Sequence, residues 1–195
     1  HMTFQDLNLS TPLLNALGDL GFTHPTPIQQ KVFSVVMSGR DVVGTAQTGT
    51  GKTFAYLLPI LRQLTFSKQK EPRVLVIVPT RELVIQLVGE IKKLTAYMPT
   101  RVEGVYGGTN INTQKLLVAN GLDVLVATPG RLVDLALSGT LNLKYVRQFV
   151  IDEVDEMLNL GFRVQLINIL DMLPRKRQNL MFSATMTEEV DALIQ

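Results

Sequence analysis

Hydrophobic residues in this chain follow two alternating patterns, and together these patterns predict the secondary structure. Short runs rich in β-branched residues predict strands, because such side chains suit a pleated, buried surface. Between them, longer stretches carry apolar residues at the three- and four-residue spacing of amphipathic helices. The predicted strands are 41–46, 73–78, 101–106, 123–128, 148–151 and 179–182. The predicted helices are 53–66, 81–97, 110–120, 130–137, 162–173 and 187–194.

The alternation of strands and helices predicts the fold class. Strands that are apolar almost throughout are typical of a sheet with helices on both faces. A strand–helix–strand series gives parallel neighbours, so we expect an α/β fold with a largely parallel, doubly wound sheet. In such sheets ligands bind at the carboxyl ends of the strands. The polar linker at 65–72 is too short to separate domains, so residues 1–195 are expected to form one domain.

Composition narrows the range of functions. The chain has 195 residues, of which 46% are hydrophobic, and this is enough for a full core. The net charge is only +2, so any nucleic-acid surface must be a local patch. The chain has no Cys, which excludes disulfide and thiolate chemistry, and with only two His no zinc site is expected. No membrane span or signal peptide is visible in the sequence, and we expect a cytoplasmic monomer without membrane contact.

The turn after the first predicted strand, AQTGTGKTF at 46–54, has the residues of a phosphate-binding loop. Glycines allow the backbone to curl so that its N–H groups surround phosphate oxygens. Lys52 reaches the terminal phosphates, and the Thr53 hydroxyl is a ligand for Mg²⁺. An ordinary glycine-rich turn is the alternative, but the position between a strand and a helix favours phosphate binding. The predicted phosphate-binding residues are Ala46, Gln47, Thr48, Gly49, Thr50, Gly51, Lys52 and Thr53. The strict pattern has Gly at the first of these positions, where this chain has Ala46.

A cluster of carboxylates follows the fifth predicted strand, in FVIDEVDE at 149–156. One explanation is the acidic first turn of a helix, which the helix dipole stabilises. The other is the acidic partner that a phosphate-binding loop needs. We predict that Asp152 holds Mg²⁺ through water and that Glu153 orients or deprotonates the attacking water. Glu156 is interpreted as a solvated charge. The predicted catalytic residues are thus Lys52 and Glu153, and the predicted metal ligands are Thr53 and Asp152.

Together these motifs resemble those of the DEAD-box ATP-dependent RNA helicases, in the family's order and over nearly the whole chain. They are GFTHPTPIQ (21–29), AQTGTGKT (46–53), PTREL (79–83), GG (107–108), TPGR (128–131), DEVD (152–155) and SAT (183–185). Each short motif is weak alone, and the shared order carries the resemblance. The family's own tetrapeptide is Asp-Glu-Ala-Asp. Here Val154 replaces the Ala, a packing change that leaves the predicted metal ligand and base in place.

The resemblance implies a RecA-like P-loop domain that binds ATP and Mg²⁺ as the ATP-binding half of an RNA helicase. A second RecA-like domain, absent from this chain, would complete the cleft, so the isolated domain is expected to be nearly inactive. By the same resemblance Gln29 reads adenine, Phe4 stacks on its ring, and the backbone near His24 accepts a hydrogen bond from the base. A Pro-started helix with Gln29 in its first turn is the alternative explanation of TPIQ.

The resemblance also assigns residues to RNA and to coupling. Arginine forks, hydroxyls and glycines suit contacts with phosphates rather than bases, so we expect sequence-tolerant RNA binding. Without the resemblance, a simple turn would explain GG and a Pro-started helix would explain TPGR. The predicted RNA-binding residues are Thr80, Arg81, Gly107, Gly108, Thr128, Gly130 and Arg131. The predicted coupling residues are Asp155 together with its hydrogen-bond partners Ser183 and Thr185.

Two other functions stay open on the sequence. One is a P-loop ATPase that moves DNA or protein, although the Gln29 motif and PTREL argue against it. The other is a non-enzymatic, nucleotide-gated RNA clamp in which Val154 has impaired hydrolysis. Stimulation of ATP turnover by nucleic acid separates the first from a helicase, and single-turnover hydrolysis separates the second.

Overall fold

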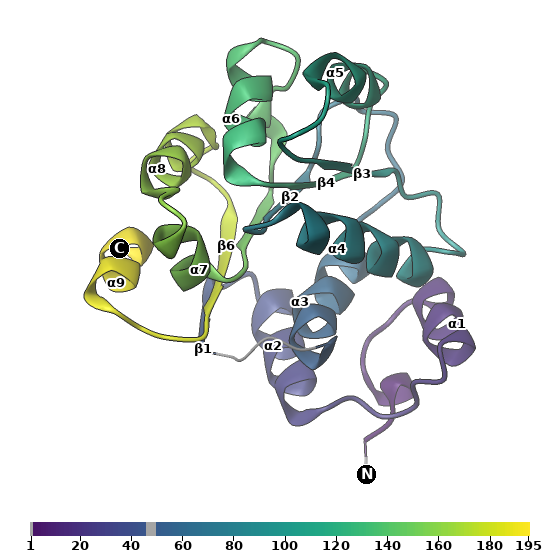
Figure 1. Cartoon of the computed structure of the whole chain (residues 1–195). Helices are drawn as coiled ribbons and strands as arrows, with labels where there is room; N and C mark the ends of the chain where they lie inside the picture. Colours follow the sequence, from purple (N-terminus) through teal and green to yellow (C-terminus); the bar gives the residue numbers. More distant parts are fainter. Residues whose placement is uncertain (1, 46–49) are drawn as a thin grey trace.

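The computed structural model describes residues 2–45 and 50–195, and it has a central sheet between two layers of helices (Figure 1). The described strands pair in the order β1-β6-β5-β2-β4-β3, and every pairing is parallel. The prediction of an α/β fold with a largely parallel sheet is therefore confirmed. Each strand lies where the sequence predicts it, with ends that differ by one residue at most. The strands are β1 Val42–Thr45, β2 Val74–Ile77, β3 Val102–Val105, β4 Val124–Ala127, β5 Gln148–Ile151 and β6 Gln178–Ser183.

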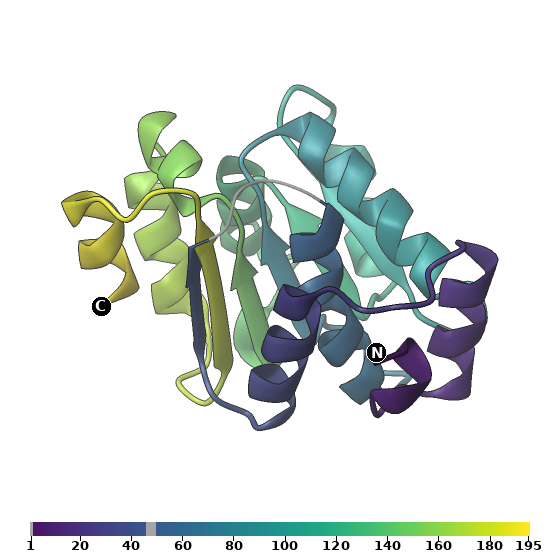
Figure 2. The same ribbon diagram turned by 90° about the horizontal axis from the view of Figure 1, so that it is seen from below.

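Helices cover both faces of the sheet, as Figures 1 and 2 show. One face carries α1 Thr11–Asp19, α2 Pro27–Met37, α3 Thr50–Gln63 and α4 Arg81–Leu94. The other carries α5 Ile111–Ala119, α6 Pro129–Leu137, α7 Val154–Asn159, α8 Arg163–Met172 and α9 Glu188–Ile194. Short 3₁₀ helices span η1 Phe4–Asp6 and η2 Leu143–Tyr145. No helix in the described ranges combines the length and apolarity needed to cross a membrane.

Two helices that the periodicity did not predict, α1 and α2, complete the first layer. In α2 Pro27 occupies the first turn and the Thr26 hydroxyl accepts a hydrogen bond from the Gln29 backbone N–H, which is an N-cap. The alternative explanation of TPIQ, a Pro-started helix, is therefore confirmed as local structure. In α1 only Leu13, Ala16 and Leu17 are buried, so the apolar pattern is too brief to identify the helix.

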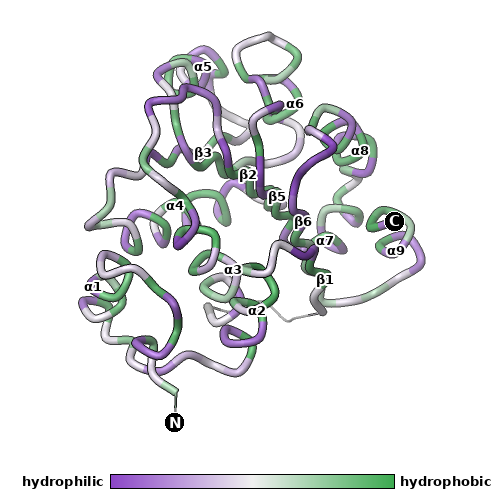
Figure 3. Tube along the Cα trace, turned by 180° about the vertical axis from the view of Figure 1, so that it is seen from behind, coloured by the Kyte–Doolittle hydropathy of each residue, from purple (hydrophilic) through white to green (hydrophobic). Residues whose placement is uncertain are grey.

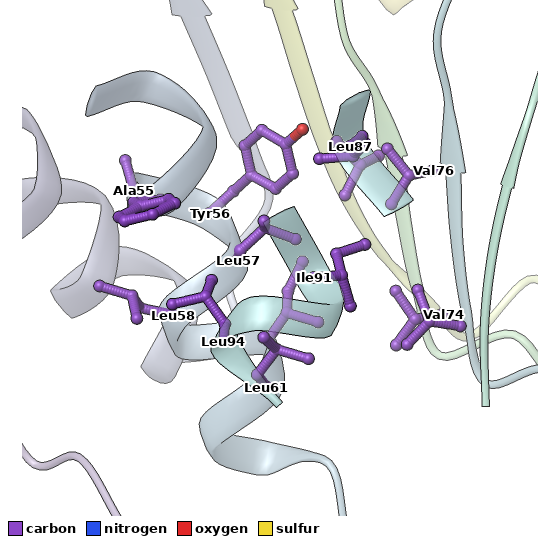
Figure 4. Close-up of a cluster of buried hydrophobic side chains, with 14 of the residues drawn as sticks. Ala55, Tyr56, Leu57, Leu58, Leu61, Val74, Val76, Leu87, Ile91 and Leu94 are labelled. Carbon is purple, nitrogen blue, oxygen red and sulfur yellow. The ribbon is translucent and has the colours of Figure 1, made fainter. Parts of the chain in front are cut away.

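Alternation along each strand divides the core into two clusters. In β2, Val74 and Val76 pack toward α3 and α4, whereas Leu75 and Ile77 pack toward the opposite layer. Figure 4 shows part of the first cluster, where leucines of α3 and α4 meet strand valines. The interior strands are buried on both faces, which explains their continuous apolar runs, and Figure 3 shows this hydrophobic centre. At the edge of the sheet, Val43 of β1 is 53% exposed.

The parallel arrangement gives the sheet a carboxyl edge, where all described strands end, and an amino edge, where they begin. The loops that follow β2, β3, β4, β5 and β6 therefore lie at the carboxyl edge, as does the start of α3. These loops carry PTREL, GG, TPGR, DEVD and SAT. Motifs that are far apart in the sequence are thus brought to one side of the molecule, where ligands of doubly wound sheets bind.

Candidate active site

The predicted phosphate-binding residues are described only from Thr50 onward. Ala46, Gln47, Thr48 and Gly49 lie outside the described residues, and their part in nucleotide binding stays a prediction. Thr50 begins α3, and Lys52 follows in the first turn of that helix. Strand β1 before residues 46–49 and helix α3 after them agree with the arrangement that a phosphate-binding loop requires. Lys52 itself is only 5% exposed.

Lys52 and Asp152 form a buried ion pair between α3 and the end of β5. The Lys52 Nζ lies 2.7 Å from Asp152 Oδ1. The second carboxylate oxygen, Oδ2, accepts a hydrogen bond of 3.3 Å from the Tyr56 hydroxyl. Burial raises the pKa of Tyr56, and the neighbouring Asp152 raises it further, so this hydroxyl stays protonated and can donate. The structure thus brings together two residues predicted from the sequence and adds Tyr56, which the sequence did not single out.

The donors around Asp152 fit Mg²⁺ that arrives with nucleotide phosphates. Asp152, Thr53, Lys52 and Glu153 line one cavity of about 270 Å³. A carboxylate and a hydroxyl are hard oxygen donors, and Mg²⁺ commonly uses one or two carboxylates together with phosphates and water. Within residues 2–45 and 50–195 no group of three His, Cys, Asp or Glu side chains is arranged to hold a metal without such help. Magnesium binding by Thr53 and Asp152 stays a prediction.

Glu153 has an unusual backbone conformation. Its φ of 61° places it in the left-handed region, and no other non-glycine residue in the described ranges has a positive φ. Such strain persists where the surrounding structure enforces it, which is often at functional sites. Burial raises the pKa of Glu153, and Asp152 raises it further, although Lys52 acts in the opposite direction. A carboxylate with a raised pKa is a stronger proton acceptor, which suits the predicted base.

The predicted coupling residues contact one another. Asp155 Oδ2 accepts hydrogen bonds from the Thr185 backbone N–H at 3.1 Å and from the Thr185 hydroxyl at 3.0 Å. The Ser183 hydroxyl accepts from the Asp155 backbone N–H at 3.3 Å. Burial acts to raise the pKa of Asp155, but hydrogen bonds to the carboxylate, above all from the Thr185 hydroxyl, outweigh it and hold the pKa below its usual range. The end of β6 is therefore tied to the first turn of α7.

Gln29 makes hydrogen bonds within the protein. Its Oε1 accepts from the Thr26 backbone N–H at 2.9 Å, and its Nε2 donates to the Gly51 carbonyl at 3.3 Å. The side chain thus joins the start of α2 to the start of α3. Recognition of adenine by the same amide stays a prediction, and it requires these hydrogen bonds to rearrange or to be shared with the base.

Phe4 and His24 differ in exposure. Phe4 is 3% exposed and belongs to the first core cluster, so in this conformation its ring has almost no free face for a base. This burial weighs against the predicted stacking, which would require the ring to turn outward. His24 is exposed, and its Nδ1 lies 2.7 Å from the Thr23 hydroxyl. Backbone contact with the base near His24 stays a prediction.

The loops after β2 and β3 present part of the predicted RNA surface. Thr80 caps α4 through its hydroxyl, and Arg81 is exposed, with its guanidinium carbon 5.0 Å from the centre of the Tyr106 ring. Gly107 and Gly108 are exposed too, and the φ of Gly108 is +83°, which favours glycine. Arg81 stacked on an aromatic ring beside exposed glycines is suited to an RNA backbone. Tyr106 was not identified from the sequence.

Arg131 is used inside the protein. Its Nη1 donates to Gln114 Oε1 at 2.8 Å and its Nη2 donates to the Thr109 carbonyl at 3.0 Å. The side chain therefore supports the loop that carries GG. Thr128 is only 8% exposed, whereas Gly130 is half-buried. RNA contact by these three residues stays a prediction, and in this conformation Arg131 positions the surface rather than presenting a free guanidinium. Gln114, which is buried, could not be found from the sequence because no motif marks it.

Comparison with known families and proteins agrees with this geometry. A family model described as DEAD/DEAH box helicase matches residues 26–193. This chain belongs to the DEAD/DEAH box helicase family. It is 45% identical to the ATP-dependent RNA helicase RhlB of Pseudomonas syringae pv. tomato over 96% of this chain and 49% of that protein. It is 43% identical to the ATP-dependent RNA helicase drs1 of Aspergillus clavatus over 98% of this chain and 24% of that protein.

A plant relative extends the similarity. The DEAD-box ATP-dependent RNA helicase 28 of Oryza sativa subsp. japonica is 42% identical over 98% of this chain and 24% of that protein. The chain therefore spans 24% of the length of two of these relatives and 49% of the third. The family predicted from the sequence motifs is confirmed, and the parallel sheet with helices on both faces agrees with a RecA-like helicase domain.

Proposed function

We propose that this helicase-family chain is the ATP-binding, first RecA-like domain of a DEAD-box ATP-dependent RNA helicase, with DEVD at 152–155 as its acidic motif. The observation that carries the proposal is the buried Lys52–Asp152 pair at the carboxyl edge, with Glu153 beside it. The relatives named RNA helicases are longer than this chain, so we assign unwinding to the chain joined to a second RecA-like domain.

Nucleotide binding follows from the groups that line the cavity. The Lys52 ammonium exchanges its contact with Asp152 for phosphate oxygens, and the carboxylate becomes available as a metal ligand together with the Thr53 hydroxyl. Magnesium, when bound, supplies positive charge to the phosphate oxygens. The amide of Gln29 is suited to adenine because it offers both a donor and an acceptor, whereas guanine presents the wrong partner.

Hydrolysis is assigned to Glu153. Glu153 lines the same cavity as Lys52 and Asp152, so it lies near the place where the terminal phosphate would bind. There it orients an attacking water and accepts the proton that the water loses. Val154 is fully buried in the second core cluster and does not line this cavity. This packing favours an active enzyme over the alternative of a clamp with impaired hydrolysis.

RNA binding is assigned to the loops at the carboxyl edge, through backbone contacts that tolerate any sequence. Arg81 and the exposed glycines 107 and 108 are the accessible members of that surface. Asp155 links to Ser183 and Thr185, so a change at the nucleotide site can reach the end of β6. A monomeric state and a cytoplasmic location stay predictions.

The test is RNA-stimulated ATP hydrolysis and duplex unwinding by residues 1–195, compared with a longer chain that includes the second domain. We expect stimulation and unwinding only from the longer chain, because arginines supplied across the cleft are worth about 10³–10⁵ in rate. Robust unwinding by residues 1–195 alone would contradict the two-domain assignment. If double-stranded DNA or a protein, and not RNA, stimulated ATP hydrolysis by the longer chain, the alternative of a P-loop ATPase that moves DNA or protein would be supported.

A further inference from the structure

Tyr56 occupies a position that the helix pattern assigns to the core, but it brings a hydroxyl to the active site. The residue lies one helical turn after Lys52 on α3 and is 1% exposed. Figure 4 shows its ring at one end of the leucine cluster, with the hydroxyl directed away from Leu57, Leu58 and Leu61 of the same helix. That hydroxyl donates to Asp152 Oδ2, while Lys52 contacts Oδ1. Each oxygen of the carboxylate is therefore held by a different residue of the same helix.

The ring of Tyr56 is itself held in place by β6 and β1. It stacks on Phe182 of β6, with ring centres 5.4 Å apart and an angle of 27° between the planes. Phe182 in turn packs over Gly44 of β1, where an added Cβ would lie 2.8 Å from the ring carbon Cδ1. A side chain confined in this way loses little further freedom when its hydroxyl makes a hydrogen bond. The contact with Asp152 is therefore built into the packing.

The two contacts on Asp152 differ in what happens when nucleotide binds. In the proposed function Lys52 moves to the phosphates, which leaves Oδ1 without its partner. The Tyr56 hydroxyl has no such second task, because its ring cannot leave the stack with Phe182 without opening the core. It is the contact that can persist and keep the carboxylate in one orientation.

We propose that Tyr56 is a positioning residue for Asp152, and that its hydroxyl orients the carboxylate for Mg²⁺ in the nucleotide complex. This inference rests on the proposed function of the site. Groups that hydrogen-bond a metal-binding carboxylate fix its direction, and their loss commonly lowers metal affinity about 10- to 100-fold. The alternative is that Tyr56 acts only through the packing of its ring.

The deciding variant is Tyr56→Phe, which removes the hydroxyl and keeps the stacked ring. The measurement is the affinity of residues 1–195 for a fluorescent ATP analogue at increasing Mg²⁺ concentration, with the thermal midpoint recorded alongside. We expect the Mg²⁺ concentration for half-maximal enhancement of binding to rise about tenfold. Binding without Mg²⁺ and the thermal midpoint should stay close to those of the wild type. An unchanged Mg²⁺ dependence would overturn the proposal.

Two further variants make the result specific. Tyr145→Phe removes the same atom from a residue that is 52% exposed on η2, and it should leave Mg²⁺ dependence unaltered. Asp152→Asn removes the group through which Tyr56 acts, so adding Tyr56→Phe to it should cause no further loss of Mg²⁺ dependence. An additive loss in the double variant would overturn the proposal. If the wild type itself showed no Mg²⁺-dependent nucleotide binding, the proposed function would be wrong instead.

Discussion

Two buried ionic clusters lie at opposite edges of the same sheet, and they are built differently. At the amino edge Asp123 accepts four hydrogen bonds, two on each carboxylate oxygen. Oδ1 accepts from Arg73 Nη2 and from Arg101 Nη2, each at 2.8 Å. Oδ2 accepts from the Arg101 backbone N–H at 2.8 Å and from Arg101 Nε at 3.3 Å. At the carboxyl edge Asp152 has one contact on each oxygen, from Lys52 and from a tyrosine hydroxyl. One carboxylate is saturated within the protein, and the other can exchange a partner.

The difference separates a structural cluster from a candidate functional one. Arginine presents a rigid fork that suits lasting pairing with a carboxylate, whereas lysine is a single mobile charge. Burial acts to raise the pKa of Asp123, but hydrogen bonds from Arg101 and Arg73 hold it below its usual range. At the carboxyl edge the net effect on Glu153 is the reverse, because burial and a neighbouring carboxylate raise its pKa. The clusters at the two edges should therefore respond differently to substitution and to pH.

The largest expected effect is on catalysis at the carboxyl edge. In the two-domain protein Glu153→Gln should slow ATP hydrolysis about 10²- to 10⁴-fold, because the attacking water loses its base. Nucleotide binding should be retained. The matched control is Glu156→Gln, an exposed neighbour that should change little. Single-turnover hydrolysis measures both, and equal damage by the two variants would contradict the division of roles within the acidic cluster.

The next effect is on stability at the amino edge. Asp123→Asn leaves the buried Arg73 and the partly exposed Arg101 without their counter-charge. Because Arg73 then stays buried and unpaired, we expect a loss of about 3–5 kcal/mol in the free energy of unfolding. Asp152→Asn should cost less, because its site opens to a cavity and Lys52 can be solvated there. Urea unfolding of both variants measures the difference between their free energies of unfolding. Equal losses would show that the two edges are energetically alike.

A smaller effect is expected on base selection. Gln29→Ala should narrow the difference between ATP and GTP binding by about 1–3 kcal/mol, which is the value of one bidentate base contact. The same change removes the contact between Gln29 and the Gly51 carbonyl, so some affinity for both nucleotides should be lost. Titration with both nucleotides separates these effects. If the affinities for ATP and GTP fell by the same factor, Gln29 would act only through its contact with Gly51 and would not recognise adenine.

The smallest effect is a difference in pH dependence. Because the folded pKa of Asp123 is lowered, its stabilisation is complete above the unfolded pKa and is lost as pH falls through the folded pKa. Because the folded pKa of Glu153 is raised, acidification through it favours the folded state. Thermal midpoints across the acidic range measure both. Asp123→Asn should reduce the fall of the thermal midpoint at low pH. Glu153→Gln should remove the rise of the thermal midpoint that mild acidification causes in the wild type. If the thermal midpoints of both variants changed with pH as the wild-type midpoint does, the pKa shifts assigned to Asp123 and Glu153 would be contradicted.

The hydrophobic pattern of the chain determined where the strands lie, since a short apolar, β-branched run identifies a buried strand without knowledge of its neighbours in the sheet. It missed α1, where only Leu13, Ala16 and Leu17 are buried and the apolar pattern is brief. The glycines, Lys52 and the carboxylates of DEVD could be identified because phosphate and metal chemistry requires those residue types at short spacing. The same motifs identified the family, and the family match confirms it.

Only the tertiary structure decided which side chains meet. Tyr56 and Asp152 are 96 positions apart, and Arg73 and Asp123 are 50 apart, so their contacts depend on the order of strands in the sheet. Sequence spacing carries no information on that order, since several parallel arrangements satisfy the same pattern. For the same reason the burial of Phe4 could not be foreseen. The sequence determined which groups are available, and the fold determined which of them are paired.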